Sequence, residues 1–384
     1  MDSLKDKACL VGVGNTTYSK NSGMSATKLI LTAAKNAIED AGLKPHDIDG
    51  CITPIMGLSS YEIAAELGIP DLKWAVQVNM GGASPVAGVI NAAMAVAYGI
   101  CNYVICPVGW NGYSGMRVKD LMSAEEMTLP MGDTAANFEA PYGAFVPAQW
   151  YSVLCRRHML EFGTTHDHLG AIAVAERTHA QNNPNAQMRG RPMTLEDYHN
   201  SRWISDPYHL LDCCIETDGA ACCIITSAER AKDMPNKPVY IMGGGIGHPY
   251  PGDDISNRPD MGDIGLTWAA PRAFKMAGVK PTDVDFMQIY DCFTFEVLNQ
   301  IEEVGMCKRG EGGPWLEGGK KITWPDGRYP LNTHGGLLSE GHIIGMNHIL
   351  EAVRQLRGTA NNQVKDAKLG LVTGWGDFGD GSVM

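Results

Sequence analysis

Short apolar runs of strand length alternate with longer helix-like segments along this chain. Tyr103–Val108 reads YVICPV, and Asp285–Tyr290 and Leu369–Thr373 are comparable runs in the second half. Val86–Ala97 carries so many alanine and methionine residues at close spacing that we expect a buried, central helix. Strands buried on both faces read as continuous apolar runs, because helices cover each face of the sheet. The pattern therefore predicts an α/β fold.

Part of this pattern occurs twice. Residues 37–49 read AIEDAGLKPHDID and residues 273–285 read AFKMAGVKPTDVD, with seven of thirteen positions identical. In both copies a helix should end at a glycine, Gly42 or Gly278, where a left-handed residue is favoured. A short element opened by proline and then a strand should follow. The repeat predicts a duplicated unit.

The duplication divides the chain into an N-terminal half, residues 1–235, and a C-terminal half, residues 236–384. Residues 110–200 interrupt the strand–helix alternation with a polar, proline-containing stretch. Long excursions in compact domains are usually functional, so we expect an insertion that covers a site. An ordinary decorated loop is the alternative.

Composition narrows the class of protein that such a fold serves. Of 384 residues, 44% are hydrophobic and 19% are charged, and the formal net charge is −12. These values exclude a disordered chain, and the negative charge argues against a nucleic-acid binder, since phosphate contacts need a basic patch. No apolar run reaches the roughly 18 residues of a membrane span, and the first residues lack a signal-peptide pattern. We expect an acidic cytoplasmic enzyme that binds neither membrane nor nucleic acid.

The cysteines indicate a reducing compartment and no metal site. There are eleven, an odd number without the spacing of a disulfide framework. The densest group, DCCIETDGAACC at residues 212–223, has adjacent pairs that flank a predicted Asp-Gly hairpin turn. Zinc sites have two residues between paired cysteines instead. No metal is therefore expected in this chain.

Four segments, three of them containing glycine, are the candidates for chemistry. They are NMGGASPVAG at 79–88, YDCFTFE at 290–296, NTHGGLLSEGHIIG at 332–345 and TGWGDFGDGS at 373–382. Glycines at a strand-to-helix turn let backbone N–H groups reach an oxyanion, and α/β sites gather at strand ends. Each segment also has a plain reading: a helix capped by Ser84, an inert core cysteine, structural histidines or a glycine-rich turn.

These four segments, in this order on a duplicated α/β frame, resemble the thiolase superfamily and specifically its sterol-carrier, lipid-transfer branch. SRWISDPYHLLDCCIETDGAA at residues 201–221 is also similar to that branch, so the resemblance covers nearly the whole chain. It implies an α/β protein with a duplicated, five-layered αβαβα thiolase fold, a covering-loop insertion and a homodimer core. It further implies an enzyme that cleaves or forms a C–C bond beside a coenzyme A thioester.

The resemblance assigns roles residue by residue. His342 matches the activating histidine of a Gly-His-Pro-x-Gly motif, with Ile343 in place of its proline. Cys292 matches the acid/base cysteine of a His-Asp-Cys-Phe motif, in which Tyr290 replaces the histidine and Asp291 keeps the aspartate. Backbone donors to an oxyanion are expected at Gly82, Ala83 and Gly376.

The main departure from the family pattern is a missing nucleophile. The Asn-x-x-Cys motif aligns with Asn79-Met80-Gly81-Gly82, so Gly82 occupies the nucleophile position, and Gly374 falls where conventional thiolases carry a second cysteine. An ordinary acyl-enzyme is therefore not expected at Gly82.

Two enzymatic chemistries and one carrier function remain open. In the first, an atypical thiolase cleaves a bulky, possibly aromatic, 3-oxoacyl-CoA, with the thiol of coenzyme A or Cys292 attacking the ketone. In the second, a retro-aldolase cleaves a β-hydroxyacyl-CoA and needs no nucleophile. The sequence resembles the thiolase-like subunits both of benzoylsuccinyl-CoA thiolase and of steroid side-chain aldolases. The steroid aldolase subunits have a tyrosine at the position of His342 and no counterpart of Cys292. Because this chain has both His342 and Cys292, the sequence favours thiolysis. A non-catalytic acyl-CoA or lipid carrier is the third alternative.

The resemblance also implies ligands and partners. Coenzyme A would be a substrate, bound through phosphate contacts from Arg117 and Arg189 and through Met131, Phe145 and His334. Both enzymatic relatives act with a small companion subunit that has a zinc ribbon and an OB fold. We therefore expect a similar companion here, in addition to acyl-CoA and a second copy of this chain.

Overall fold

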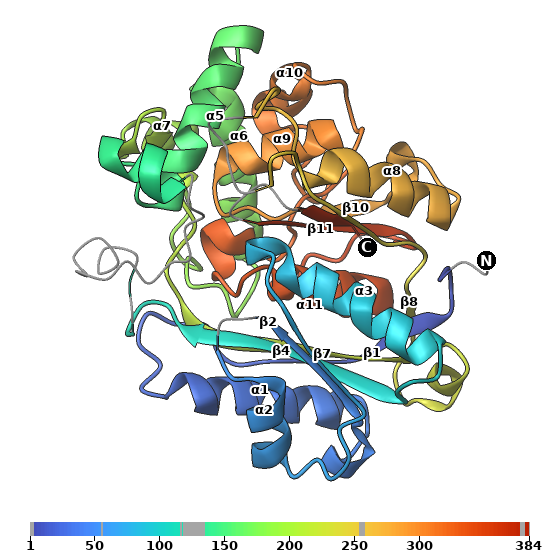
Figure 1. Ribbon diagram of the computed structural model, residues 1–384. Coiled ribbons are helices and arrows are strands. Elements are labelled where there is room, and N and C mark those ends of the chain that lie inside the picture. Colours follow the sequence, from blue (N-terminus) through green and yellow to red (C-terminus); the bar gives the residue numbers. More distant parts are fainter. Residues whose placement is uncertain are drawn as a thin grey trace.

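Five layers of helix and sheet make up the protein, as seen in a computed structural model that describes residues 4–54, 57–115, 117, 135–252, 258–376 and 381–383. Helices α1 (Ala26–Asp40) and α2 (Ser60–Leu67) cover the outer face of the first sheet. Helices α3 (Ser84–Ala97) and α11 (Met346–Arg357) lie between the two sheets (Figure 1). The second sheet is covered on its outer face by α8 and α9, which confirms the predicted αβαβα arrangement.

The first sheet has six strands in the order β3-β2-β4-β7-β1-β8. Strands β2, β3 and β4 run parallel, whereas β7 pairs antiparallel with both β1 and β4. The strands are β1 (Ala8–Asn15), β2 (Gly50–Pro54), β3 (Trp74–Val78), β4 (Tyr103–Asn111), β7 (Asp218–Ser227) and β8 (Val239–Tyr240). A separate small hairpin joins β5 (Trp203–Ser205) to β6 (Tyr208–His209).

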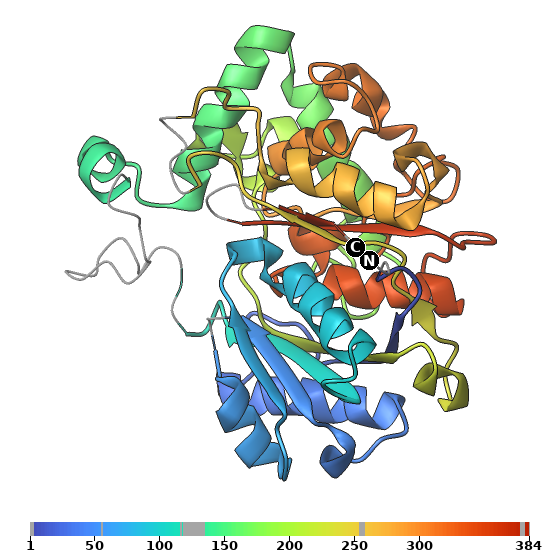
Figure 2. The ribbon, with the colours of Figure 1, turned by 45° about the vertical axis from the view of Figure 1, so that its right-hand side comes forward.

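The second sheet has four strands in the order β10-β11-β12-β9. These are β9 (Gly245–Gly247), β10 (Phe286–Gln288), β11 (Gly370–Trp375) and β12 (Gly381–Val383). Its helices are α8 (Gly265–Ala277), α9 (Thr294–Glu303) and the short α10 (Gly312–Leu316). Figure 2 shows the two sheets on either side of α3 and α11. Nearly every side chain of α3 is buried, as a helix enclosed by two sheets requires.

The two copies of the sequence repeat fold alike. Helix α1 leads to Gly42 at φ +69°, a 3₁₀ turn at Pro45–Asp47 and then β2. Helix α8 leads to Gly278 at φ +73°, a 3₁₀ turn at Pro281–Asp283 and then β10. Each turn is closed by its aspartate, which accepts a hydrogen bond from a backbone N–H three residues earlier.

The described part of the insertion includes the helices α5 (Pro147–Phe162), α6 (His166–Ala180) and α7 (Leu195–His199). Helices α5 and α6 pack on α9, so this part of the insertion covers the second half of the chain. The preceding residues Phe138 and Tyr142 are 69% and 89% exposed, on a segment that projects from the body of the molecule (Figure 2). Among the described residues, no helix is long and apolar enough to cross a lipid bilayer.

Two local predictions were wrong. Asp218 and Gly219 form no hairpin turn: Asp218 begins the continuous strand β7, because its carboxylate accepts hydrogen bonds from Tyr113 and Ser114 N–H and holds the neighbouring loop. Ser84 is not a cap but the first helical residue of α3, and its hydroxyl accepts a hydrogen bond from Met80 N–H at 2.8 Å.

Candidate functional site

All four candidate segments meet between the two sheets, at the ends of α3, α11 and β11. Gly82 lies in the 3₁₀ turn that enters α3, Tyr290 follows β10, and His342 lies in the loop before α11. The carbonyl of Trp375, at the end of β11, adjoins Gly82. This convergence places backbone from both halves around one phenol and one imidazole.

The side chain of Tyr290 fills the space that a residue at position 82 would need. A Cβ added to Gly82 would lie 2.1 Å from Tyr290 Cζ, 2.4 Å from Tyr290 Oη and 2.4 Å from the Trp375 carbonyl oxygen. On the other side, a Cβ on Gly345 would lie 2.9 Å from Tyr290 Cδ2. The ring is therefore held between two glycines, and its hydroxyl stands where the resemblance places a cysteine nucleophile.

His342 is the hydrogen-bond partner of that hydroxyl. The two atoms, Tyr290 Oη and His342 Nε2, are 3.2 Å apart. The histidine's own peptide is held from the first half: its N–H donates to Thr217 Oγ1 at 2.9 Å and its carbonyl accepts from Trp110 Nε1 at 2.8 Å. Ile344, two residues on, has φ +51°, a conformation that is rare for a β-branched residue and that marks a constrained loop.

Burial, together with the charge of the nearby His348, lowers the pKa of His342 to about 4, and Asp291 opposes this shift. The imidazole is therefore neutral at physiological pH. When Nδ1 carries its proton, Nε2 is free to accept the proton of the Tyr290 hydroxyl. The pair can act as a general base without first losing a proton to solvent.

This pKa predicts the acid limb of the pH profile. Protonation of His342 removes the acceptor, so kcat/KM should stay level as the pH falls through 6.5 and decline only toward about pH 4. Initial rates between pH 4 and 8, with circular dichroism at each pH to detect unfolding, would measure this limb. An acid limb near 6.5 in folded protein would contradict the assignment.

Asp291 lies below this pair, in a buried polar cluster. Its carboxylate accepts hydrogen bonds from the N–H groups of Leu337 and Leu338, each at 3.0 Å, and lies 2.9 Å from His348 Nε2. Burial alone would raise the pKa of Asp291, but His348 and the backbone donors outweigh it and lower that pKa. The side chain is 0% exposed, so Asp291 acts on the site through the residues it holds.

Cys292 is half-buried and lies next to the carboxyl group of Glu296. Its Sγ is 3.9 Å from Glu296 Oε2, and burial raises the pKa of Glu296 to about 8. A catalytic thiol becomes a good nucleophile when a cation or a base lowers its pKa. A largely protonated carboxyl supplies neither at neutral pH.

The structure places the other predicted residues less centrally. Ala83 N–H already donates to the Met80 carbonyl at 2.9 Å, and the Gly376 carbonyl accepts from Tyr151 Oη at 3.0 Å. His334 is 2% exposed, and its Nε2 is 3.6 Å from Glu340 Oε2. Its surroundings are those of a core residue and leave no room for a ligand.

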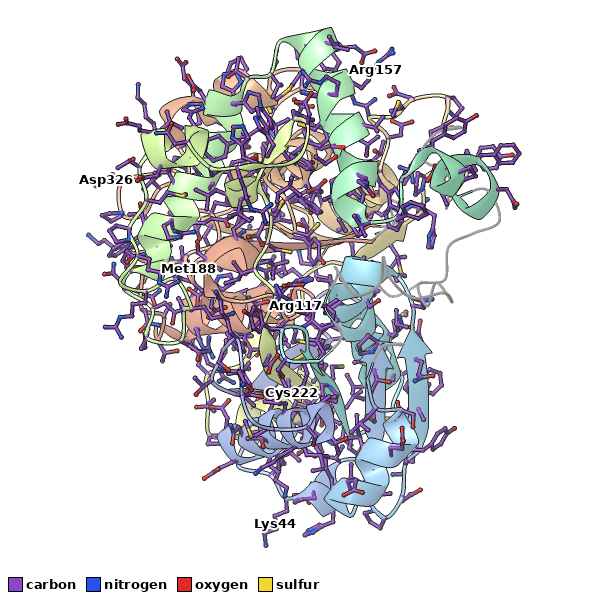
Figure 3. The ribbon with its side chains drawn as sticks, turned by 90° about the vertical axis from the view of Figure 1, so that its left-hand side faces the viewer. Lys44, Arg117, Arg157, Met188, Cys222 and Asp326 are labelled. Carbon is purple, nitrogen blue, oxygen red and sulfur yellow. The ribbon has the colours of Figure 1, made fainter. Side chains whose placement is uncertain are left out.

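Among the arginines expected to bind coenzyme A, Arg117 is held beside the segment that contacts His342. Its Nε donates to Glu216, the neighbour of Thr217, at 2.8 Å, and its guanidinium lies 4.4 Å from the Tyr113 ring centroid. Figure 3 shows Arg117 at the junction of the two halves. Arg189 is exposed in the turn before α7, and Phe145 is half-buried just before α5. Met131 lies outside the described residues.

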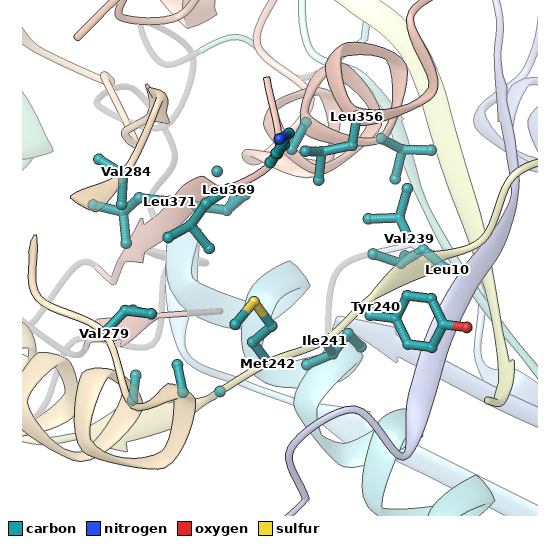
Figure 4. A pocket seen from close by; sticks show the side chains of 18 of the residues that line it. Leu10, Val239, Tyr240, Ile241, Met242, Val279, Val284, Leu356, Leu369 and Leu371 are labelled. Carbon is teal, nitrogen blue, oxygen red and sulfur yellow. The ribbon is translucent and has the colours of Figure 1, made fainter. Parts of the chain in front are cut away.

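A separate apolar pocket opens between β8, α8, β11 and α11 (Figure 4). Its walls include Leu10, Met242, Phe274 and Leu371, and none of the residues around Tyr290 lines it. Tyr240 and Lys368 are the titratable side chains of this otherwise apolar lining, and neither is paired with a second acid or base there, so the Tyr290–His342 pair remains the candidate active site.

Sequence reasoning missed Thr217, Trp110, Glu176 and His348. Thr217 and Trp110 lie in ordinary strand-like sequence far from His342, and no spacing links them to it. His348 carried a weak signal, since it follows His342 on a segment that was already singled out.

Comparison with known proteins identifies the family to which this architecture belongs. The family described as thiolase C-terminal domain-like matches residues 247–384. A steroid side-chain-cleaving aldolase of Thermomonospora curvata is 41% identical over 97% of this chain and 96% of its own. The 17-hydroxy-3-oxo-4-pregnene-20-carboxyl-CoA lyase of Mycobacterium tuberculosis is 40% identical over 96% of each chain.

A solved structure, that of the Ltp2-ChsH2(DUF35) aldolase, superposes with a TM-score of 0.92 at 39% identity and covers 100% of this chain and 98% of its own. These likenesses extend over both halves, including the insertion in the first, and they agree with the five layers described above. The chain is therefore an enzyme of the thiolase superfamily, in its sterol-carrier-type branch.

Proposed function

We propose that this chain is a retro-aldolase, which cleaves the Cα–Cβ bond of a β-hydroxyacyl-CoA into a carbonyl compound and a shorter acyl-CoA. The observation that carries the proposal is the Tyr290 ring beside Gly82, because it excludes a nucleophile from that position and supplies a hydroxyl next to a neutral imidazole. Two relatives that are 41% and 40% identical to this chain are named as an aldolase and a lyase. Both lines of support favour this chemistry over the thiolysis that the sequence alone favoured.

The reaction needs one base and one site for an enolate. Tyr290 Oη takes the proton of the substrate hydroxyl as its own proton moves to His342 Nε2, the β-carbon becomes a carbonyl, and the Cα–Cβ electron pair passes into the thioester as an enolate. His342 then returns the proton through Tyr290 to Cα. No oxidant, metal or covalent intermediate is required, and atoms and charge balance within the pair.

The enolate oxygen needs backbone N–H donors, because a buried negative charge without hydrogen bonds is strongly destabilised. We assign this role to the N–H groups of Gly82 and Gly376, which flank the phenol from α3 and from the end of β11. Ala83, whose N–H is already engaged in the turn, is left out of the assignment.

One assay separates the two enzymatic functions. The chain, with its companion where one is available, is given a β-hydroxyacyl-CoA without free coenzyme A, and in parallel a 3-oxoacyl-CoA with it. Release of a ketone or aldehyde in the first reaction supports the retro-aldolase. Cleavage only in the second supports direct thiolysis, and tight binding without cleavage in either supports a carrier.

Removal of the Cys292 thiol should have little effect on this chemistry. Since the retro-aldol reaction uses Tyr290 and His342, Cys292→Ala should lower kcat by less than about tenfold, well below the 10²–10⁴-fold range of a lost acid or base. Steady-state kinetics on the β-hydroxyacyl-CoA would measure the change. A loss of several orders of magnitude in folded Cys292→Ala would return the cysteine to the reaction and favour thiolysis.

Partners are proposed on two observations. The solved aldolase named above includes ChsH2(DUF35), and we assign this chain a small companion subunit, of the zinc-ribbon and OB-fold kind that the sequence resemblance implies. Strand β3 is the outer strand of the first sheet, and Trp74, Val76 and Val78 are only partly buried there. An edge with unpaired backbone and apolar side chains suits a second copy of this chain. Co-purification and light scattering would test both assignments.

A further inference from the structure

Two buried carboxyl groups face each other beneath the active site. Glu176 comes from α6 of the insertion and Asp291 from the loop after β10, and both are 0% exposed. They meet over Gly336, at which an added Cβ would lie 2.1 Å from Asp291 Oδ2 and 2.5 Å from Glu176 Oε2. Gly336 has φ +63°, so both its conformation and the two carboxyls require glycine there.

The two groups differ in how many donors they have. Asp291 has two backbone N–H donors and the nearby His348. Glu176 Oε1 accepts one hydrogen bond, from Asn332 Nδ2 at 2.8 Å, and Glu176 Oε2 has no donor among the described residues. Two neighbouring carboxylates cannot both be ionised in a buried site. Burial and the charge of Asp291 accordingly raise the pKa of Glu176, so the proton belongs on Glu176 and the charge on Asp291.

We propose that Glu176 is a positioning residue of the active site, whose protonated carboxyl donates a hydrogen bond from Oε2 to Asp291 and thereby holds the loop that carries His342. The chain of contacts is short. Asp291 anchors Leu337 and Leu338 in the π-helical turn Gly336–Glu340, and His342 follows this turn by two residues. The insertion would therefore have two roles: it covers the second half of the chain, and through the carboxyl group of Glu176 it holds the loop that carries His342.

The decisive variant is Glu176→Gln, because an amide mimics a protonated acid. Its N–H₂ can donate to Asp291 while its carbonyl accepts from Asn332, so kcat should stay within about tenfold of the wild type. Glu176→Ala removes the donor and frees the turn, and a shift of about 1 Å at a catalytic group costs on the order of 10²-fold in kcat. KM should change much less, because Glu176 does not touch substrate. Equal losses in folded Glu176→Gln and Glu176→Ala would overturn the proposal.

Two measurements need no substrate and so separate this proposal from the proposed function. The infrared difference spectrum of wild type minus Glu176→Gln at neutral pH should contain the C=O band of a protonated carboxyl. Other buried acids cannot supply this band, because their bands are present in both proteins and cancel in the difference. The imidazole resonances of His342 should move in Glu176→Ala and stay in place in Glu176→Gln. A difference spectrum with only carboxylate bands would overturn the proposal, even with an enzyme that shows no retro-aldol turnover. Should Glu176→Ala not fold, the infrared comparison still decides the matter.

Discussion

Replacing Tyr290 by phenylalanine should lower kcat by about 10²–10⁴-fold, the usual contribution of a general acid or base, with little change in stability. The phenyl ring still fills the space between Gly82 and Gly345, so the packing survives. Only the oxygen 3.2 Å from His342 Nε2 is lost. Steady-state kinetics on a β-hydroxyacyl-CoA and a thermal melt on the same sample would measure both effects.

Two further variants frame this result. His342→Gln should impair kcat to a similar degree, and the Tyr290→Phe, His342→Gln double variant should be little worse than either, because the two residues act as one relay. Tyr61→Phe removes the hydroxyl of a tyrosine that is 72% exposed and should leave kcat unchanged. Near-normal turnover by Tyr290→Phe would remove the phenol from the mechanism and leave His342 as a lone base.

The layered fold could be predicted from the sequence because its signals are local. The repeat at residues 37–49 and 273–285 needs only a helix, a left-handed glycine and a proline-led turn, and the same succession is found in both halves. Tyr290 and His342 were found because each lies in a glycine-flanked or strand-end motif. Their contact was not predicted, because a hydrogen bond between side chains on separate loops depends on how the two sheets are stacked.

What the sequence missed depends on contacts between distant segments. Glu176 lies on an amphipathic-looking helix of the insertion, and nothing near it in the chain indicates that its carboxyl reaches Asp291. The hairpin predicted at Asp218 failed for the same reason, since that carboxylate is engaged by the loop after β4 and lets the strand continue. The preference for thiolysis rested on the presence of both His342 and Cys292, and the surroundings of these side chains could not be known before the fold.

Introducing a side chain at Gly82 should destabilise the protein by about 3 kcal/mol or more, as overpacking of a rigid core does. Gly82→Cys would place the missing cysteine at its family position, but its Cβ would lie 2.1 Å from Tyr290 Cζ and 2.4 Å from the Trp375 carbonyl. The Tyr290 ring can move or be replaced by a smaller side chain, whereas the backbone carbonyl of Trp375 cannot. Part of the destabilisation should therefore remain when position 290 carries a smaller residue. Urea denaturation of the variant would give the change in free energy of unfolding.

A second substitution makes that test specific. In a Tyr290→His background, which restores the family residue beside position 82, Gly82→Cys should cost at least about 1 kcal/mol less than it does alone, the coupling expected of residues in direct contact. Gly88→Ala, in the helix α3 that follows the turn of Gly82, has its nearest neighbour at 3.4 Å; it should be tolerated and serves as the control. If Gly82→Cys costs the same in both backgrounds, the phenol does not occupy the nucleophile's place. If the cost falls and the double variant gains an acyl adduct with an acyl-CoA, then one exchange between Gly82 and Tyr290 separates retro-aldol from thiolase chemistry on this fold.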